Sequence, residues 1–419
     1  MSENNFKKQK IVICGPFTEN AGYSYLNRSL FYNLIKRDWD VGIENMRCNL
    51  EIEDKEKNFL FKYEAPVQYI HGKNLKVFMD IDCIKIFCWL PVSLVRAPKF
   101  KKRIIYTMME TKGVDQNFIN LCNSSFDECW VPTSYYKNVF LENGLSMPAK
   151  VIPIGIDNFY DKKNIDRDYK LNYIKYSRNE KDPDIPSGFR FISVFRWSYR
   201  KGYDVLIKSY LKEFKRSDDV SLMIFSRHAK STFDKKYYDA VNADIQNLYS
   251  EYSKEDSPPI YWCSECVPIE KMPNVYDGEC FISCSRGEGQ SLPSLEATKM
   301  GLPTILPRHT GFLDYVNDET SYPIDVDEWV ICNDVPEWKI WITRNFVNQE
   351  FPKFGEKAIK QTREHMRNVY ENYDEALKKK DKLLEVVNSK YNWDNIIDLV
   401  EDNLNQFILE DRLEKKVVI

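Results

Sequence analysis

The feature that most constrains the fold is a regular alternation of short apolar runs with segments of helical spacing. Residues 10–14 form a β-branched run that ends at Gly15, and apolar residues then recur at helical spacing from Tyr25 to Ile35. A second series of the same kind starts at residues 189–195. Alternating strands and helices bury their apolar faces when helices cover both sides of a parallel sheet. The sequence therefore predicts an α/β protein with two doubly wound sheets, whose ligand sites lie at the carboxyl ends of the strands.

A polar stretch separates the two series. From residue 158 to 188 the composition shifts to Lys, Asp, Asn and Tyr, which is typical of a connection between domains. We expect an N-terminal Rossmann-like domain over 1–157, a polar linker over 158–188 and a C-terminal Rossmann-like domain over 189–390. Residues 391–419 are expected to form a C-terminal helix, which could pack back on the first domain.

Composition narrows the classes of function. Lys plus Arg number 60 and Asp plus Glu number 63, so the chain lacks the basic surplus of a nucleic-acid binder, and no specific nucleic acid is expected as a partner. No two of the 4 histidines lie within a helical turn, which disfavours a His-rich metal site. The first residues lack an apolar signal segment. The longest apolar stretch, residues 86–95, is shorter than the roughly 20 residues of a membrane-spanning helix. We therefore expect a cytoplasmic protein.

The segment 283–305 carries the pattern most informative about chemistry. A strand ends near Ser285, a turn with Gly287 follows, and Pro293 marks the start of a helix. Glu288 then lies at the mouth of the strand and Glu296 in the first turns of the helix. The backbone N–H groups expected to face an anion at the helix start are those of Gly289, Gln290, Ser291 and Leu292. Two carboxylates beside such amides suggest a site for a phosphorylated polyol; the alternative is an ordinary strand-to-helix turn.

Two cations follow the strand at residues 189–195. Arg196 and Lys201 lie five positions apart, directly before Gly202, in an expected strand-to-helix loop. Such a pair can clamp a diphosphate, with the guanidinium binding in bidentate fashion. The alternative is that both charges are merely solvated.

These patterns together resemble the retaining GT-B glycosyltransferases of family 4. Glu288 and Glu296, separated by seven residues and followed by Gly301-Leu-Pro, resemble that family's glutamate pair, and Arg196 with Lys201-Gly202 resembles its phosphate-binding pair. Further matches in the same order are Asp127–Ser134, Val151–Asp157 and Met272–Tyr276. The resemblance covers residues 10 to about 320, and it implies two Rossmann-like domains facing a cleft, with a helical C-terminal tail.

The resemblance also implies roles. A nucleotide-sugar donor would be held mainly by the C-terminal domain, and Glu296 would bind the ribose. Arg196 and Lys201 would neutralise the diphosphate, while Glu288 and the amides of residues 289–292 would hold the sugar and phosphate. A sugar, of the hexosyl type, would pass with retention to an unknown acceptor: a glycan, a lipid-linked glycan, a protein or a small molecule. No cofactor and no metal ion are expected.

The first domain would face the acceptor. Family members carry a glycine-rich loop after the first strand, and the comparable residues here are Gly15, Asn20, Ala21 and Gly22. Many relatives place a histidine after a middle strand of this domain, where this chain has Glu110. That carboxylate is expected either in the cleft or as a charge at a helix start.

Other readings remain open. Asp80 with Asp82, and Asp325 with Asp327, repeat the D-x-D pattern of metal-dependent glycosyltransferases, although the pattern is common by chance. The basic residues between 96 and 103 could touch anionic lipid at the inner face of a membrane, and the alternative is a solvated face before the buried strand that begins at Ile104. The alternative functions are a nucleotide-sugar epimerase of the same fold and a non-catalytic nucleotide-sugar-binding subunit of a glycan-assembly complex.

Overall fold

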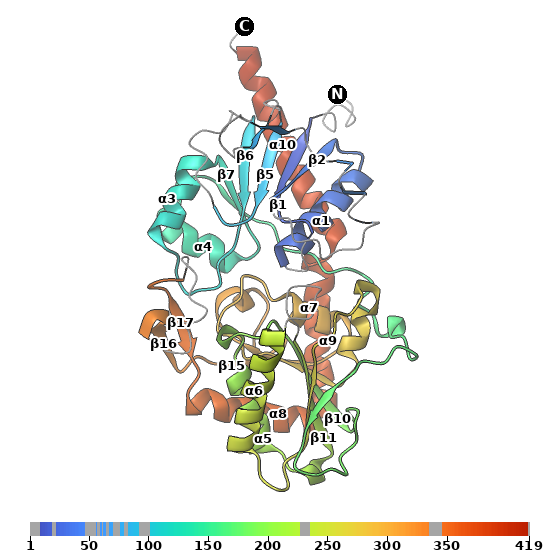
Figure 1. The fold of residues 1–419 in the computed structure, drawn as a ribbon. Helices are drawn as coiled ribbons and strands as arrows, with labels where there is room; N and C mark the ends of the chain where they lie inside the picture. The colour runs from blue at the N-terminus through green and yellow to red at the C-terminus, as the bar shows by residue number, and fades with distance from the viewer. Residues whose placement is uncertain are drawn as a thin grey trace. The chain divides into compact units, whose positions relative to one another are not determined.

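A computed structural model describes residues 9–18, 22–46, 56, 59–60, 62–63, 67–69, 76–78, 83–91, 101–226, 235–334 and 346–417 (Figure 1). The chain forms two compact units. Unit 1 comprises Met1–Met109, Gln116–Gly155 and Lys390–Ile419, and unit 2 comprises Glu110–Asp115 and Ile156–Ser389. The boundary predicted at residue 157 therefore falls at Gly155 in the structure.

Unit 1 is built on a parallel sheet. Its strands, in spatial order, are β2 (Val41–Asn45), β1 (Ile11–Gly15), β5 (Ile84–Cys88), β6 (Lys102–Tyr106), β7 (Glu128–Val131) and β8 (Ala149–Val151). All of these pairings are parallel. Every residue of β1 and β5 is buried, as expected of central strands that helices cover on both faces. A separate antiparallel pair joins β3 (Val67–Tyr69) to β4 (Lys76–Phe78).

The helices of unit 1 with fully described bounds are α1 (Gly22–Lys36), α3 (Gln116–Ser125), α4 (Ser134–Glu142) and, from the C-terminal end of the chain, α10 (Trp393–Val417). Helix α10 packs on α1 (Figure 1). Arg37, directly after α1, pairs with Glu401 at 2.8 Å, and Trp39 Nε1 donates to the same carboxylate at 2.7 Å. The C-terminal helix therefore belongs to unit 1.

Unit 2 contains a second, larger sheet. Its strands, in spatial order, are β15 (Tyr322–Ile324), β14 (Thr304–Pro307), β13 (Cys280–Ile282), β10 (Phe189–Val194), β11 (Val220–Phe225), β12 (Ile260–Cys263) and β9 (Ile174–Tyr176). All neighbours are parallel except β9, which runs antiparallel to β12. The prediction of a doubly wound α/β protein is confirmed.

The prediction of a polar linker over 158–188 is wrong. Strand β9 lies within that range and adds an edge strand to the sheet of unit 2. Asp182, also within the range, accepts from Arg216 Nε at 2.9 Å. The polar composition reflects an edge strand with solvated flanks, because an edge strand buries less apolar surface than a central one.

Helices cover the sheet of unit 2 and complete its core. Among the residues that the structure describes, the α-helices of this unit are α5 (Tyr203–Glu213), α6 (Lys235–Tyr252), α7 (Leu292–Lys299), α8 (Glu356–Glu371) and α9 (Tyr373–Lys390). The described 3-10 helices are η2 (Lys162–Asn164), η3 (Tyr199–Lys201), η4 (Arg216–Asp218), η5 (Ile269–Tyr276), η6 (Thr310–Asp314) and η7 (Cys332–Asp334). A small antiparallel pair joins β16 (Glu328–Ile331) to β17 (Glu350–Lys353).

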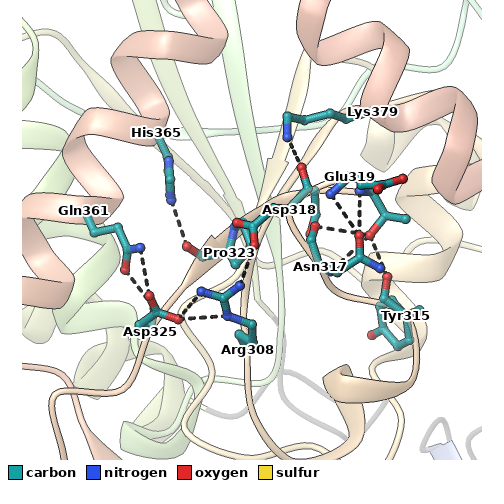
Figure 2. A network of polar contacts seen from close by, with 12 residues as sticks. Arg308, Tyr315, Asn317, Asp318, Glu319, Pro323, Asp325, Gln361, His365 and Lys379 are labelled. Carbon is teal, nitrogen blue, oxygen red and sulfur yellow. Dashed lines mark hydrogen bonds and ion pairs between the residues drawn. The ribbon is translucent and has the colours of Figure 1, made fainter.

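A polar network anchors the segments around β14 and β15 to the C-terminal helices of unit 2 (Figure 2). Arg308, which follows β14, pairs with Asp318 and with Asp325 at 2.8 Å each. On α8, Gln361 binds Asp325, and His365 Nε2 donates to the carbonyl of Pro323 at 2.8 Å. These contacts hold in place the chain on either side of η6.

Among the described residues, no helix is both long and apolar enough to cross a membrane.

Candidate functional site

The candidate site lies where the strand order of unit 2 reverses. Strand β10 has β11 on one side and β13 on the other, and the chain proceeds outward from each. The loop after β10 spans residues 195–202, and the loop after β13 spans 283–291. Because the strands are parallel, both loops emerge at the same edge of the sheet. Doubly wound sheets bind ligands in the crevice at this point.

The two loops are in direct contact. Gly202 has a φ of 69°, and a Cβ there would lie 1.9 Å from the carbonyl oxygen of Cys284. A side chain is excluded both by this approach and by the left-handed backbone. The backbone N–H of Arg286 donates to the carbonyl of Arg200 at 2.6 Å. The packing of the strands thus brings the predicted cation loop against the predicted glutamate loop.

Four charged side chains meet at this contact. Lys201 Nζ lies 2.5 Å from Glu288 Oε1. The guanidinium of Arg200 lies 3.0 Å from Glu110 Oε1 and 3.6 Å from Glu288 Oε2, and it also donates to the carbonyl of Gly287. Two cations and two carboxylates therefore alternate in a cluster, all within unit 2. An anion could bind to the two cations of this cluster, and the hydroxyl groups of a polyol could donate to its two carboxylates.

Burial and neighbouring charge shift the pKa values of the central pair. Burial lowers the pKa of Lys201, and the neighbouring Arg200 charge lowers it further against the opposing effect of Glu288. Burial by itself would raise the pKa of Glu288, but the charges of Lys201 and Arg200 outweigh it, so the net shift is downward. Glu288 is therefore held as a carboxylate, although only 7% of the residue is exposed.

The backbone of Glu288 is held by the segment after β14. Its N–H donates to Thr310 Oγ1 at 3.3 Å, and its carbonyl accepts from the N–H of Gly311 at 3.0 Å. Thr310 has a φ of 47°, a left-handed conformation that is strained for a β-branched residue. A Cβ at position 311 would lie 2.2 Å from the carbonyl oxygen of Gly289. Residues 310 and 311 thus hold the turn that presents Glu288.

Glu296 lies in a different environment from Glu288. It is half-buried on α7, and the hydroxyl of Tyr276 donates to its carboxylate. Burial raises the pKa of Glu296 to about 7, although hydrogen bonds from Tyr276 and Tyr160 oppose the rise. The predicted pair therefore divides into a carboxylate stabilised by cations and a carboxyl group that titrates near neutrality.

The start of α7 matches the predicted turn. The helix runs from Leu292 to Lys299, Ser291 is its N-cap, and the Ser291 side chain makes no capping hydrogen bond. Gln290 and Ser291 are buried, with 5% and 3% exposed. The first backbone N–H groups of a helix have no partner within it, and they favour an anion.

The structure separates the predicted cation pair. Lys201 belongs to the charge cluster, whereas Arg196 is exposed and makes no ion pair with another described residue. Arg200, which is not among the predicted site residues, is the second cation of the cluster. Its position next to Lys201 was the available signal, but spacing could not tell which of the loop's arginines faces Glu288.

Glu110 lies in unit 2 and not, as the predicted range 1–157 implied, in the first domain. The segment Glu110–Asp115 belongs to unit 2, and Glu110 pairs with Arg200 there. A Cβ on Gly287 would lie 1.8 Å from the carbonyl oxygen of Glu110, so this segment packs against the glutamate loop. The chain leaves the first domain for six residues, a path that strand-and-helix periodicity cannot reveal.

The other residues predicted on the acceptor side belong to unit 1. Gly15 ends β1, where a Cβ would lie 2.7 Å from the carbonyl oxygen of Cys88. Gly22 is exposed at the first residue of α1. Asn20 and Ala21 lie outside the described residues.

The two D-x-D patterns have different outcomes. Asp325 pairs with Arg308, and Asp327 accepts hydrogen bonds from the first N–H groups of α8, at Lys357 and Ala358. Both aspartates thus have structural partners. Asp80 and Asp82 lie outside the described residues.

The structure describes three of the five basic residues between positions 96 and 103. Lys101 donates to Gln9 at 2.6 Å, Lys102 pairs with Glu128 at 3.0 Å, and Arg103 pairs with Asp127 at 2.7 Å. These three cations have partners within unit 1. Arg96 and Lys99 lie outside the described residues.

Known proteins match this chain in structure and not in sequence. No protein-family model and no curated protein sequence matches it. HepE from Anabaena, in complex with UDP-glucose, has a TM-score of 0.61 at 11% identity, covering 95% of this chain and 99% of that one. A glycosyltransferase from Rickettsia africae has a TM-score of 0.63 at 12% identity, covering 96% and 99%. Sucrose-phosphate synthase from Thermosynechococcus elongatus has 0.62 at 12% identity, covering 96% and 100%. The predicted GT-B fold is confirmed.

Proposed function

We propose that this protein is a retaining glycosyltransferase that moves a sugar from a nucleotide-sugar donor to an acceptor without a metal ion. The observation that carries the proposal is the Lys201–Glu288 ion pair at the reversal point of the unit 2 sheet. It places a cation suited to a diphosphate directly beside a carboxylate suited to sugar hydroxyls. HepE, which shares the fold, has been solved with UDP-glucose, and that compound is therefore the first donor to test.

The cations would act on the leaving group. During transfer the bond between the anomeric carbon and the diphosphate oxygen breaks, and negative charge develops on that oxygen. Lys201 would turn from Glu288 toward the diphosphate, and the exposed Arg196 would supply a second charge. Charges held in a fixed, partly buried site stabilise such a transition state more than water does.

Glu288 would act on the sugar. Positive character grows at the anomeric carbon as the leaving bond breaks, and a carboxylate kept ionised by its neighbours stabilises that charge. The acceptor oxygen would attack on the same face, and its proton would pass to the departing diphosphate. This order of events rests on the resemblance to the retaining GT-B enzymes.

Glu296 would bind the ribose. Its carboxyl group is held by Tyr276, and a ribose hydroxyl can donate to the remaining oxygen lone pairs. The ribose does not change charge during transfer, so this contact would contribute to binding of donor and nucleotide product alike.

The remaining parts of the proposal concern the setting. The acceptor would be a glycan, a lipid-linked glycan, a protein or a small molecule, and the reaction would need no cofactor. A cytoplasmic location and contact with the inner face of a membrane are further predictions.

The first experiment is a thermal-shift screen with UDP-glucose and other nucleotide sugars, followed by release of nucleotide with and without candidate acceptors. A ligand at about 100 times its Kd stabilises the folded protein by about 2.7 kcal/mol. Lys201→Met should abolish turnover. The matched control is Lys353→Met, which removes a cation from an exposed pair with Glu328 in the same unit and should leave turnover unchanged.

The outcomes separate the alternatives. Slow nucleotide release without acceptor, accelerated by an acceptor that becomes glycosylated, supports the transferase. Free sugar with an altered configuration, independent of any acceptor, would indicate the epimerase. Binding of a nucleotide sugar without any turnover would indicate the non-catalytic subunit, and no binding at all would refute the proposal.

A further inference from the structure

Arg286 is a buried cation that none of the roles above uses. It is 1% exposed and lies two residues before Glu288, in the loop after β13. Its guanidinium donates to both carboxylate oxygens of Asp204, at 2.8 and 2.7 Å, and to the carbonyl of Tyr199 at 2.6 Å. The ring of Tyr199 lies 3.8 Å from the guanidinium carbon. Arg286 is thus enclosed by protein and is not available to a substrate.

Stability alone does not account for this residue. Removing a guanidinium from water is costly, and well-packed apolar side chains often stabilise a core as much as a buried ion pair does. The rings of Tyr199 and Phe354 already line the position, so an apolar side chain would find suitable neighbours. Arg286 Nε also lacks a hydrogen-bond partner among the described residues. What the charged pair adds is direction, because the planar guanidinium binds a carboxylate in one orientation.

The contacts of Arg286 bracket the turn that carries Lys201. Tyr199 begins η3, Lys201 ends it, and Asp204 lies in the first turn of α5. The backbone N–H of Arg286 also donates to the carbonyl of Arg200 at 2.6 Å. One residue therefore binds the Lys201 segment at three points, while Glu288 follows two positions later on the same loop.

We propose that Arg286 is a positioning residue: paired with Asp204, it sets the geometry of the Lys201–Glu288 ion pair by fixing one loop against the other. Its effect on the rate rests on the proposed function. Its effect on the ion pair concerns only this chain's own residues and can be tested without any substrate.

The first test measures how strongly Lys201 and Glu288 are coupled. Thermal melting of the variants Lys201→Met, Glu288→Gln and the double variant gives the coupling as the non-additive part of the shift in melting temperature. In an Arg286→Met background that coupling should fall to roughly half or less, because the guanidinium contacts are lost and only backbone contacts still join the two loops. A coupling equal to that of the wild type would overturn the proposal. If Arg286→Met does not fold, Asp204→Asn takes its place, because it removes the partner charge at constant size.

A matched control is available at the opposite ends of the same strands. Arg190, in β10, pairs with Glu279, directly before β13, at 2.9 Å. This pair also joins the two strands, but it lies away from the carboxyl ends where the loops emerge. Arg190→Met should therefore lower the melting temperature and leave the Lys201–Glu288 coupling intact. Loss of coupling in this control would show that any broken pair has the same effect and would refute a specific role.

The second test is kinetic. A misplacement of about 1 Å costs on the order of a hundredfold in rate, so Arg286→Met and Asp204→Asn should lower kcat by about tenfold to a hundredfold. Affinity for the free nucleoside, which lacks the diphosphate that Lys201 would bind, should change by no more than about twofold, as expected of sites that share no contact. Arg286→Lys keeps the charge without the planar geometry and should fall between the wild type and Arg286→Met. An unchanged kcat would overturn the proposal, whereas a wild type without turnover would refute the proposed function and leave the coupling test decisive.

Discussion

The raised pKa of Glu296 predicts how the stability of the folded protein changes with pH. Burial moves this pKa from 4.5 to about 7. A carboxyl group whose pKa is higher in the folded state than in the unfolded state favours folding when it is protonated. Its contribution is therefore complete below about pH 4.5 and is lost as the pH rises to about 7. Glu296→Gln replaces it with a side chain of the same size that cannot ionise.

The magnitude follows from the shift. Each pKa unit corresponds to about 1.4 kcal/mol, so the ionised Glu296 costs the wild type about 3 kcal/mol above pH 7. Relative to the wild type, Glu296→Gln should gain that amount between pH 4.5 and pH 8. For a domain of about 150–250 residues, 1 kcal/mol shifts the melting temperature by about 2–4 °C, so the relative gain is about 6–12 °C.

The assay is thermal melting of both proteins from pH 4.5 to pH 8, without nucleotide. The matched control is Glu356→Gln in α8, where Lys208 lowers the pKa of the carboxylate, so that this variant should gain nothing as the pH rises. A stability difference between Glu296→Gln and the wild type that does not change with pH would refute the reasoning. Under the proposed function, the stabilised variant should nevertheless bind UDP-glucose more weakly at pH 8, because the ribose would lose its carboxylate acceptor.

Four further predictions concern the site. Glu288→Gln should lower kcat by about a hundredfold or more, which is the effect of losing one preorganised electrostatic contact, and should hardly change the affinity for nucleotide. A loss of nucleotide affinity at normal kcat would show that the two glutamates have the opposite roles. Glu296→Ala should weaken binding of donor and free nucleotide alike, raising KM with kcat maintained, as titration calorimetry and initial rates can check. EDTA should leave turnover unchanged, and a loss that Mn²⁺ or Mg²⁺ restores would instead point to Asp80 and Asp82. Gly202→Ala should lower both the melting temperature and turnover, because its Cβ would meet the carbonyl of Cys284 at 1.9 Å; Gly301→Ala has a similar φ of 78° but open space to 3.4 Å, and it should cost less.

Much of the architecture followed from local patterns. The apolar runs at 10–14 and 189–195 correspond to the strands β1 and β10, because a buried parallel strand must be apolar on both faces. The glutamate loop was also foreseen, since a Gly-bearing turn and Pro293 mark a strand-to-helix junction within a few residues. The sequence pattern does not reveal strand β9, because an edge strand is partly solvated and its residues need not be apolar.

The pairing of charges was decided by tertiary structure alone. Sequence spacing chose Arg196 as the partner of Lys201, whereas the fold brings Arg200 to Glu288 and draws Glu110 into unit 2. Ion pairs depend on which loops the packed strands bring together, and those contacts join residues far apart in the chain.

The chemical state of the two glutamates was likewise beyond the sequence. Both are the same residue type, yet the pKa of Glu288 is lowered by the charges of Lys201 and Arg200, and that of Glu296 is raised by burial. A pKa reflects the solvent that folding removes and the charges that folding places nearby. The chain's local patterns determined the strands and the turn that present these residues, and the packing around each carboxyl group decided what it can do.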